Sequence, residues 1–596
     1  MELVFVHIDE FKGVKDILLE LHSGFSCCKR DNLIKVEKAD NTKNHHYYLN
    51  NNVKLILGKN GVGKTTILEF IESLFNNINQ TSAYGTALFH DGFKFHRITT
   101  SRWLKISADA DIEDIDKPQR TALLYVDNIF DIKKYAFGQI EKKSENTLKL
   151  TDNTILSKKL GKRKILRNEL KREFDLVQSN YFSSMKASFG IEVNYRFKVY
   201  KSSIRRFREY LSKLEQNLFK DLIHDPSLAS RIKAYSKGDN TLLKNTSSLQ
   251  EIYNENVLTE NRKKEIRKHI EHALCGFVQK ELLTIELPKY AEDNYLAFIS
   301  IFVPELSHKY STGLKNEQER MFFYCYSILN FTLGEKEHIE EIFVESLRKV
   351  PFDEDVSDRI SSCSKIVDTL ERMSSLCFEN SIKVKSDSEG LYFDLTSEVQ
   401  VYSLSPLIEY IMDDVSDNIS YGWHGLSSGE LAKLKLYSRV YDGARQLIRK
   451  EVDTVLIVID EIDTYLHPEW QRRTLKELLG IINSLKSYRN GSSKFQLILT
   501  SHSPIVMSDF LKHDIISLSK NNGYLEIEKA SGFGTVISHL YLDGMHLEST
   551  FGELARESID DLFLARNKNK INSYHRYLIN QIPDEDIQKM FLNSDD

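Results

Sequence analysis

A glycine-rich run at residues 58–65, Gly-Lys-Asn-Gly-Val-Gly-Lys-Thr, has the chemistry to hold a nucleotide. It follows the apolar stretch 53–57 and precedes the apolar stretch 67–70, so we expect a strand, a loop and a helix in that order. Glycines let backbone amides surround phosphates, and the start of the helix attracts the same anion. The run predicts a phosphate-binding loop (P-loop) for ATP or GTP, with these binding residues: Asn60, Gly61, Gly63, Lys64, Thr65 and Thr66.

Within this loop, two side chains have separate expected roles. Lys64 would reach the β- and γ-phosphates, and the Thr65 hydroxyl would be a ligand of Mg²⁺.

Two adjacent carboxylates follow a second apolar stretch. Residues 454–459 are β-branched or aliphatic, which predicts a buried strand, and Asp460 and Glu461 come directly after it. In open parallel sheets, charged groups meet ligands at such strand ends. We expect Asp460 to hold Mg²⁺ and Glu461, which points the other way, to act as general base on the attacking water. The alternative is an acidic strand end that faces solvent.

A histidine follows a third apolar stretch. Residues 495–500 predict a buried strand, and His502 comes two residues after it. Since it repeats the position of Asp460 at the tip of a neighbouring strand, we expect His502 to contact the γ-phosphate as a catalytic residue. The alternative is a purely structural histidine.

A short polar motif precedes a further helix. Residues 425–430 read Gly-Leu-Ser-Ser-Gly-Glu, and apolar residues follow at helical spacing. The motif resembles the signature of ABC-type ATPases, which implies that Ser427, Ser428, Gly429 and Glu430 bind the γ-phosphate held by a second subunit. The alternative is an ordinary capping box, in which the Ser427 and Glu430 side chains cap the helix. The two interpretations are compatible.

In the order P-loop, signature, Asp-Glu and histidine, these motifs resemble the ABC-type ATPases of the SMC, RecF and OLD group. They resemble more closely the AAA-type ATPases of bacterial anti-phage defence loci. The resemblance also includes residues 6–13, 460–471 and 500–504, and it covers about 1–130 and 380–540. It implies an α/β fold: a P-loop ABC-type ATPase head, with a mixed sheet flanked by helices, and a large inserted helical arm. It also implies ATP and Mg²⁺ as cofactors.

The sequence departs from this family pattern at three places. Asn128 is a poor match for the glutamine of the Q-loop, and His467 stands where transporters have the aspartate of the D-loop. The tail after His502 shows no arrangement like the Toprim nuclease domain of OLD-type enzymes. We therefore expect no intrinsic nuclease activity and a separate effector, such as the small HNH nuclease of Septu-like systems.

The spacing of the motifs predicts an insertion. Between Thr66 and Leu426 the chain is far longer than a minimal head requires, and apolar residues at helical spacing recur within residues 204–218 and 266–277. We expect four domains: 1–135, N-terminal part of the head; 136–375, helical arm; 376–540, C-terminal part of the head, with strands at 382–384 and 391–395; and 541–596, helical tail.

Composition narrows the class of protein. The chain has 596 residues with a net charge of -5, which neither requires nor excludes nucleic acid. The N-terminus lacks the basic and apolar regions of a secretory signal, and no apolar run is long enough to cross a bilayer. We therefore expect a cytoplasmic protein without a membrane partner. Six cysteines without CxxC spacing favour free thiols.

These expectations combine into a cytoplasmic ATPase that forms a homodimer or a higher even-numbered homo-oligomer around ATP and controls an effector protein. Basic clusters in the arm, around residues 158–172, 205–208 and 262–268, could instead bind DNA or RNA, although interleaved glutamates favour solvated helix faces. Two alternatives remain: a RecF-like DNA-repair ATPase and a structural scaffold that hardly turns over ATP.

Overall fold

The computed structural model divides the chain into two compact units, Met1–Met185 with Ser427–Asp596, and Lys186–Leu426. We call them unit 1 and unit 2. The described residues are 1–39, 44–76, 82–101, 103–127, 145–157, 162–179, 181–182, 194–201, 204–228, 230, 259–283, 294–312, 314–333, 339–349, 357–414, 419–486, 493–521, 524–528, 530–544, 552–568 and 570–592.

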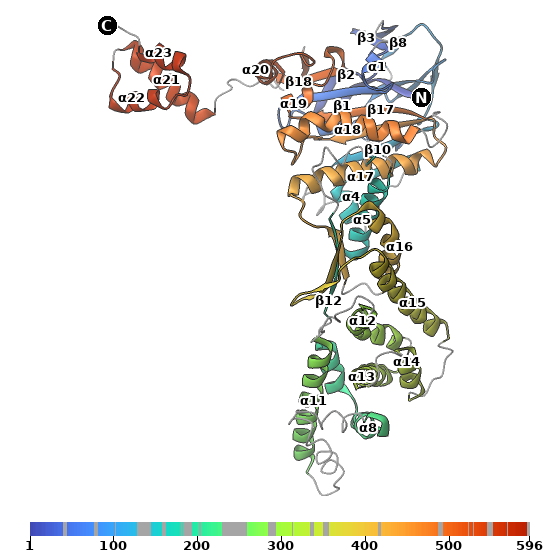
Figure 1. Ribbon diagram of the computed structural model, residues 1–596. Coiled ribbons are helices and arrows are strands. Elements are labelled where there is room, and N and C mark those ends of the chain that lie inside the picture. The colour runs from blue at the N-terminus through green and yellow to red at the C-terminus, as the bar shows by residue number, and fades with distance from the viewer. Residues whose placement is uncertain are drawn as a thin grey trace. The chain divides into compact units, whose positions relative to one another are not determined.

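A seven-stranded sheet forms the centre of unit 1 (Figure 1). Its strands are parallel except at the β18–β19 pair. In sheet order they are β11 (Thr147–Leu150), β10 (Thr121–Asp127), β16 (Thr454–Asp460), β17 (Lys494–Ser501), β5 (Asn52–Gly58), β18 (Ile515–Asn521) and β19 (Tyr524–Glu528). Strand β16 is buried along its whole length and β17 at every residue but Lys494, because both faces of the sheet are covered, as is usual for parallel sheets.

Helix α2 (Lys64–Phe75) covers one face of this sheet and is itself covered by a second, five-stranded sheet. The second sheet contains, in order, β2 (Val14–Glu20), β1 (Glu2–Phe11), β6 (Tyr84–His90), β7 (Phe95–Thr99) and β9 (Ile112–Asp114). A three-stranded sheet, β3 (Phe25–Arg30), β4 (Leu33–Lys38) and β8 (Lys105–Ser107), packs on its outer side. The helix after the P-loop is therefore held between two sheets.

Helix α17 (Ser428–Ile448) covers the opposite face of the seven-stranded sheet. A side chain added at Gly443 would meet Leu124 and Leu150, whereas Leu123 faces α2 on the other side. Helix α18 (Pro468–Lys486) packs on α17. Helix α5 (Lys162–Val177) also packs on α17, through ion pairs such as Arg172–Asp442 and Arg445–Asp175.

Unit 2 combines helices with a four-stranded antiparallel sheet. The sheet order is β13 (Lys385–Ser386), β14 (Gly390–Leu395), β12 (Tyr195–Tyr200) and β15 (Ile419–Trp423). Its helices include α7 (Arg205–Lys213), α8 (Gln216–His224), α11 (Glu260–Leu283), α12 (Asn294–Ser311), α13 (Glu317–Leu333), α14 (Ile339–Arg348), α15 (Ser357–Glu379) and α16 (Glu398–Asp414). Within it, α12 packs against α13 and α15.

The α/β class and the mixed sheet with flanking helices are confirmed, whereas several local expectations need correction. The strand expected at 382–384 lies at 385–386. It pairs with β14, and β14 pairs with β12, so both strands lie within unit 2. The single helix expected over 204–218 is two helices, since Leu214 is extended. The four expected domain ranges stay a prediction. That unit 2 acts as an arm stays a prediction.

Some of the described Lys and Arg side chains of the expected basic clusters form ion pairs or hydrogen bonds within the chain. Arg172 pairs with Glu169 and Asp442, and Arg267 pairs with Glu271 and donates to backbone carbonyls. These contacts favour a structural role for the two arginines over one in nucleic-acid binding. Residues 158–161 lie outside the described part of the chain.

The C-terminal helices form a small bundle, which we call the C-terminal bundle. It consists of α21 (Glu553–Asn567), α22 (Ser573–Asn580) and α23 (Glu585–Leu592), around a core of Leu562, Ile579 and Phe591. Among the described residues of the whole chain, no helix combines the length and apolar character needed to cross a membrane.

One glutamine joins the two large sheets of unit 1. Gln496 in β17 is buried; its Oε1 accepts from Leu3 N at 2.7 Å, and its Nε2 donates to Leu3 O and Leu21 O at 2.8 Å each. The first strand is therefore attached to the seven-stranded sheet by a side chain that completes its backbone hydrogen bonds.

Replacing Gln496 by Met should lower the free energy of unfolding of unit 1 by about 2–4 kcal/mol, because the buried N–H and carbonyl of Leu3 lose these hydrogen bonds. Chemical denaturation measures the loss, and hydrogen exchange at the Leu3 amide should accelerate. Gln581→Met, at an exposed glutamine, is the matched control. Equal stability of the two variants would contradict this assignment.

Candidate functional site

The carboxyl ends of four neighbouring strands bring the sequence motifs to one edge of the seven-stranded sheet. Asp127 of β10 lies in register with Asp460 of β16. On the other side of β16, strand β17 leads to His502, and β5 beyond it leads into the P-loop. Since parallel strands end at the same edge, residues far apart in sequence meet there.

The P-loop connects β5 to α2 in the expected way. Gly63 caps α2 with φ 112°, a left-handed conformation that side chains disfavour, and Gly61 has φ 76°. Lys64 is buried and its ammonium donates to Gly58 O at 2.8 Å and Lys59 O at 3.2 Å. Burial lowers the pKa of Lys64, although Glu461, Asp460 and Asp463 oppose this. Asn60 and Gly61 are exposed, while Thr65 and Thr66 are half-buried.

Asp460 joins three of these segments. It is buried; its Oδ2 accepts from Thr65 Oγ1 at 2.8 Å, and its Oδ1 accepts from Thr500 Oγ1 at 2.6 Å. Thr500 also accepts from Glu461 N at 2.7 Å. The structure thus brings together the two residues that the sequence assigns to Mg²⁺, Thr65 and Asp460.

Glu461 and His502 lie next to each other. The His502 Nε2 and Glu461 Oε1 atoms are 3.7 Å apart, and Thr464 Oγ1 donates to Glu461 Oε2 at 3.0 Å. Glu461 has φ 50°, an uncommon conformation for a residue with a side chain. The pKa of Glu461 is lowered, first by His502 and then by Thr464, while partial burial opposes the shift. This carboxylate is therefore ionised at neutral pH and is able to accept a proton.

A third carboxylate at this edge was missed by the sequence interpretation. The Asp127 Oδ1 atom is buried and has no hydrogen-bond partner among the described residues. Burial raises the pKa of Asp127 to about 7; Arg439 lowers it, whereas Asp460 and Asp152 raise it further. The sequence could have indicated Asp127, because this residue directly follows the mostly apolar stretch 121–126, as Asp460 follows 454–459. Asn128, the expected Q-loop residue, lies outside the described residues.

Arg439, also missed, connects the signature helix α17 to this edge. Its guanidinium is buried and donates to Asp127 O at 2.7 Å, to Glu169 Oε2 at 2.7 Å and to Asp152 Oδ1 at 2.5 Å. An arginine inside an amphipathic helix gives no sequence signal of burial, so only the fold identifies it.

Residues 425–430, which we call the signature turn, lie at the exposed start of α17. Ser427 and Glu430 form the capping box that the alternative interpretation predicts: Ser427 N donates to Glu430 Oε2 at 2.7 Å, and Glu430 N donates to Ser427 Oγ at 3.3 Å. Ser428 is exposed. A side chain at Gly429 would lie 2.5 Å from the Trp470 ring, so this position requires glycine. Among the described residues, no hydrogen bond or ion pair joins this turn to the P-loop of the same chain.

The oxygen ligands at the strand edge fit Mg²⁺ bound together with a nucleotide. Mg²⁺ prefers one or two protein oxygens, several waters and substrate phosphates. Thr65 Oγ1 and Asp460 Oδ2, 2.8 Å apart, provide such oxygens, and the unpartnered Asp127 Oδ1 lies on the neighbouring strand. No group of three or more His, Cys, Asp or Glu suited to a metal ion occurs in the described part of the chain.

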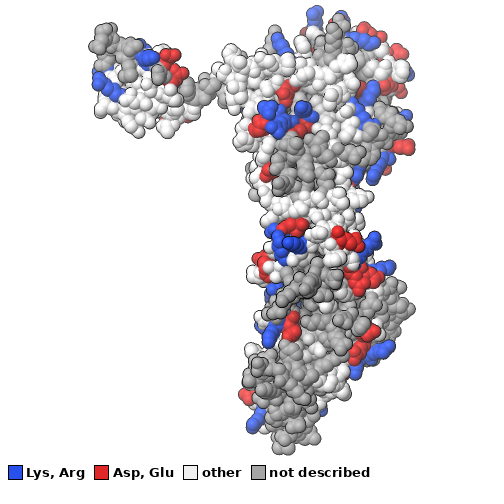
Figure 2. Space-filling model, in the orientation of Figure 1, with Lys and Arg blue, Asp and Glu red and all other residues white. Residues whose placement is uncertain are grey.

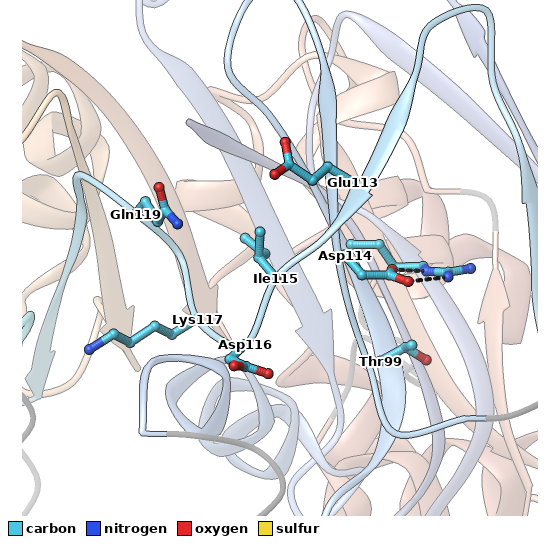
Figure 3. A pocket seen from close by; sticks show the side chains of 8 residues that line it. Thr99, Glu113, Asp114, Ile115, Asp116, Lys117 and Gln119 are labelled. Atoms are coloured by element: carbon cyan, nitrogen blue, oxygen red, sulfur yellow. Dashed lines mark hydrogen bonds and ion pairs between the residues drawn. The ribbon is translucent and has the colours of Figure 1, made fainter.

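A separate polar hollow of about 510 Å³ lies by β7, β9 and the segment that follows them. Arg97 pairs there with Asp114, with Nε–Oδ1 and Nη2–Oδ2 distances of 2.6 and 2.7 Å. Figure 3 marks the contacts of Asp114 with dashed lines. None of the expected site residues lines this hollow, and Arg97 and Asp114 pair with each other, so we assign it no ligand.

Comparisons with known proteins agree with this geometry. A family model described as "AAA ATPase domain" matches residues 1–507. The "Retron Ec83 probable ATPase" of Escherichia coli is 30% identical over 151 residues, which cover 22% of this chain and 25% of that protein. The chain thus matches about a quarter of the length of this relative.

The stability of Asp127→Asn should respond differently to pH from that of the native chain. In the folded native chain the Asp127 carboxyl has a pKa of about 7, whereas an aspartate in the unfolded chain has a pKa near 3.8. The native free energy of unfolding therefore falls as pH rises through this window. Without Mg²⁺, the free energy of unfolding of the variant should rise by up to about 4 kcal/mol relative to that of the native chain between about pH 4 and pH 7.5.

Urea denaturation across this pH range measures the difference. Asp109→Asn, at an exposed aspartate, is the control. A constant difference between Asp127→Asn and the native chain would show that Asp127 is ionised throughout.

Proposed function

The chain belongs to the AAA ATPase domain family, and we propose that it hydrolyses ATP between two copies of itself and thereby controls a separate effector protein. The observation that carries the proposal is the contact between Thr65 Oγ1 and Asp460 Oδ2 at 2.8 Å, because it joins the P-loop to the strand end that bears Glu461.

In this proposal each group at the strand edge has a distinct task. The amides around Gly61 and Gly63 and the ammonium of Lys64 hold the β- and γ-phosphates. Thr65 and Asp460 would hold Mg²⁺, which neutralises charge on the phosphates when bound. Glu461 orients the attacking water and accepts its proton, a task supported by its ionised carboxylate and its place one residue after Asp460. His502 orients Glu461 and contacts the γ-phosphate.

The exposed signature turn supports completion of the site by a second copy. The start of α17 presents Ser427 and Ser428 to solvent, and the amides of a helix start favour an anion. A capping box and a phosphate contact are compatible, because the box uses the Ser427 and Glu430 side chains and leaves other amides of the first turn available. We infer a head-to-head dimer with two composite sites, as two-fold symmetry requires.

The biological role proposed is anti-phage defence, with an effector such as an HNH nuclease encoded nearby. The similarity to an ATPase named for a retron supports this context, although it covers only 22% of this chain. The intramolecular pairing of Arg172 and Arg267 favours an effector-controlling ATPase over a RecF-like protein whose clusters bind DNA directly.

Replacing Glu461 by Gln should lower steady-state phosphate release about 100-fold or more, because the amide cannot accept the proton of the attacking water. The same variant should accumulate an ATP-dependent dimer, measured by light scattering. Glu451→Gln, at an exposed glutamate away from the site, should keep the native rate. Normal hydrolysis by the Glu461→Gln variant would show that another group is the base.

Mixing two inactive variants tests whether the site is shared between subunits. Lys64→Ala lacks the P-loop cation and Ser427→Arg blocks the signature turn, so each should be inactive alone. In a mixed dimer one site combines an intact P-loop with an intact turn, so an equal mixture should recover about a quarter of the native rate.

The control mixture is Lys64→Ala with Glu461→Gln. Lys64 and Glu461 belong to the same half of each composite site, so no mixed site is intact and no rate should return. Recovery in neither mixture would indicate a site completed within one chain, contrary to the proposal.

A further inference from the structure

The C-terminal bundle carries a segment with a marked charge bias. Residues 562–583 contain four Lys and Arg residues and no Asp or Glu. The four are Arg566, Lys568, Lys570 and Arg576. Lys568, Lys570 and Arg576 are exposed, and in the part of the chain that the structure describes none of the four forms an ion pair. Figure 2 shows blue Lys and Arg side chains and red Asp and Glu side chains on this bundle.

Two tyrosines lie in the same segment with their rings exposed. Tyr574 and Tyr577 are each 60% exposed and stand three residues apart on α22, so they share one face of the helix. The opposite face is fixed, because Asn572 and His575 form a capping box and His575 Nε2 lies 3.1 Å from Asp561 Oδ2. The two rings are thereby held outward.

The chain folds back tightly between α21 and α22. Lys570 N donates to Ala565 O at 2.8 Å and Lys568 N donates to Leu564 O at 3.2 Å, which places the cations at the end of α21 beside the start of α22. The dipole of α21 accounts for cations at its own C-terminus, Arg566 and Lys568. It does not account for Arg576 or for the exposed tyrosine pair, which point to a ligand.

We propose that this surface binds single-stranded nucleic acid. We call it the basic tyrosine surface: Arg566, Lys568, Lys570, Tyr574, Arg576 and Tyr577. Unpaired cations neutralise phosphates, and exposed aromatic rings stack on unpaired bases, which together recognise single strands without sequence preference. A protein contact accounts less well for Lys568 and Lys570, because the centres of protein interfaces are depleted of lysine. The inference is independent of ATP hydrolysis at the P-loop.

Charge reversal of the full chain tests the phosphate contacts. The triple variant Lys568→Glu, Lys570→Glu and Arg576→Glu should bind a fluorescein-labelled single-stranded oligonucleotide about tenfold or more weakly in fluorescence anisotropy. The slope of log affinity against log salt should fall in magnitude by about 2. The matched control reverses the charge of three exposed lysines elsewhere in unit 1, Lys38, Lys94 and Lys105, and should bind as the native chain does.

Substitution of the tyrosines tests the stacking contacts. Tyr574→Ala with Tyr577→Ala should weaken binding about tenfold or more, whereas Tyr574→Phe with Tyr577→Phe should keep it, because phenylalanine retains the ring. The native chain should prefer single-stranded DNA or RNA over a duplex of the same sequence. Unchanged unfolding midpoints would show that the variants are folded.

Three results would overturn the proposal: equal affinity of the charge-reversed variant and the lysine control, no loss on removal of the tyrosine rings, or a preference for duplex. A bundle that docks a protein through its other exposed side chains, such as Leu554 and Met590, would give the first two results.

Discussion

The Asp460 carboxylate is the contact on which the arrangement of the strand edge depends. Its two oxygens accept hydrogen bonds from Thr65 at the start of α2 and from Thr500 in β17, so it joins three segments distant in sequence. A buried carboxylate must be hydrogen-bonded or paired, and here the donors belong to the site itself. The same requirement that stabilises the fold therefore fixes the relative positions of the P-loop, Glu461 and His502.

Sequence reasoning located the parts of the site that have a local pattern. The glycine spacing of the P-loop and the apolar strands before Asp460 and His502 can be read without knowledge of the fold, and their strands lie where expected. The missed residues lack such a pattern. Asp127 was passed over for Asn128, although it ends the strand in register with Asp460, and Arg439 is recognisable only through partners far away in sequence.

The same limit applies to strand pairing in unit 2. Residues 390–395 form a strand as expected, but the sequence does not say which strand they pair with, and the partner β12 lies about 190 residues earlier. Strand pairing over such distances is set by tertiary packing, whereas helical spacing is local. The interruption at Leu214 between α7 and α8 is likewise a backbone detail that apolar spacing cannot reveal.

The strand order of unit 1 has a consequence for synthesis of the protein on the ribosome. Strand β5, which leads into the P-loop, is paired on its two sides with β17 and β18, and both are translated after the whole of unit 2. At about 5–20 residues per second, this apolar strand waits on the order of half a minute or more for its neighbours. The nascent chain thus exposes an aggregation-prone segment while unit 2 emerges, which makes it a natural client for chaperones that act during translation.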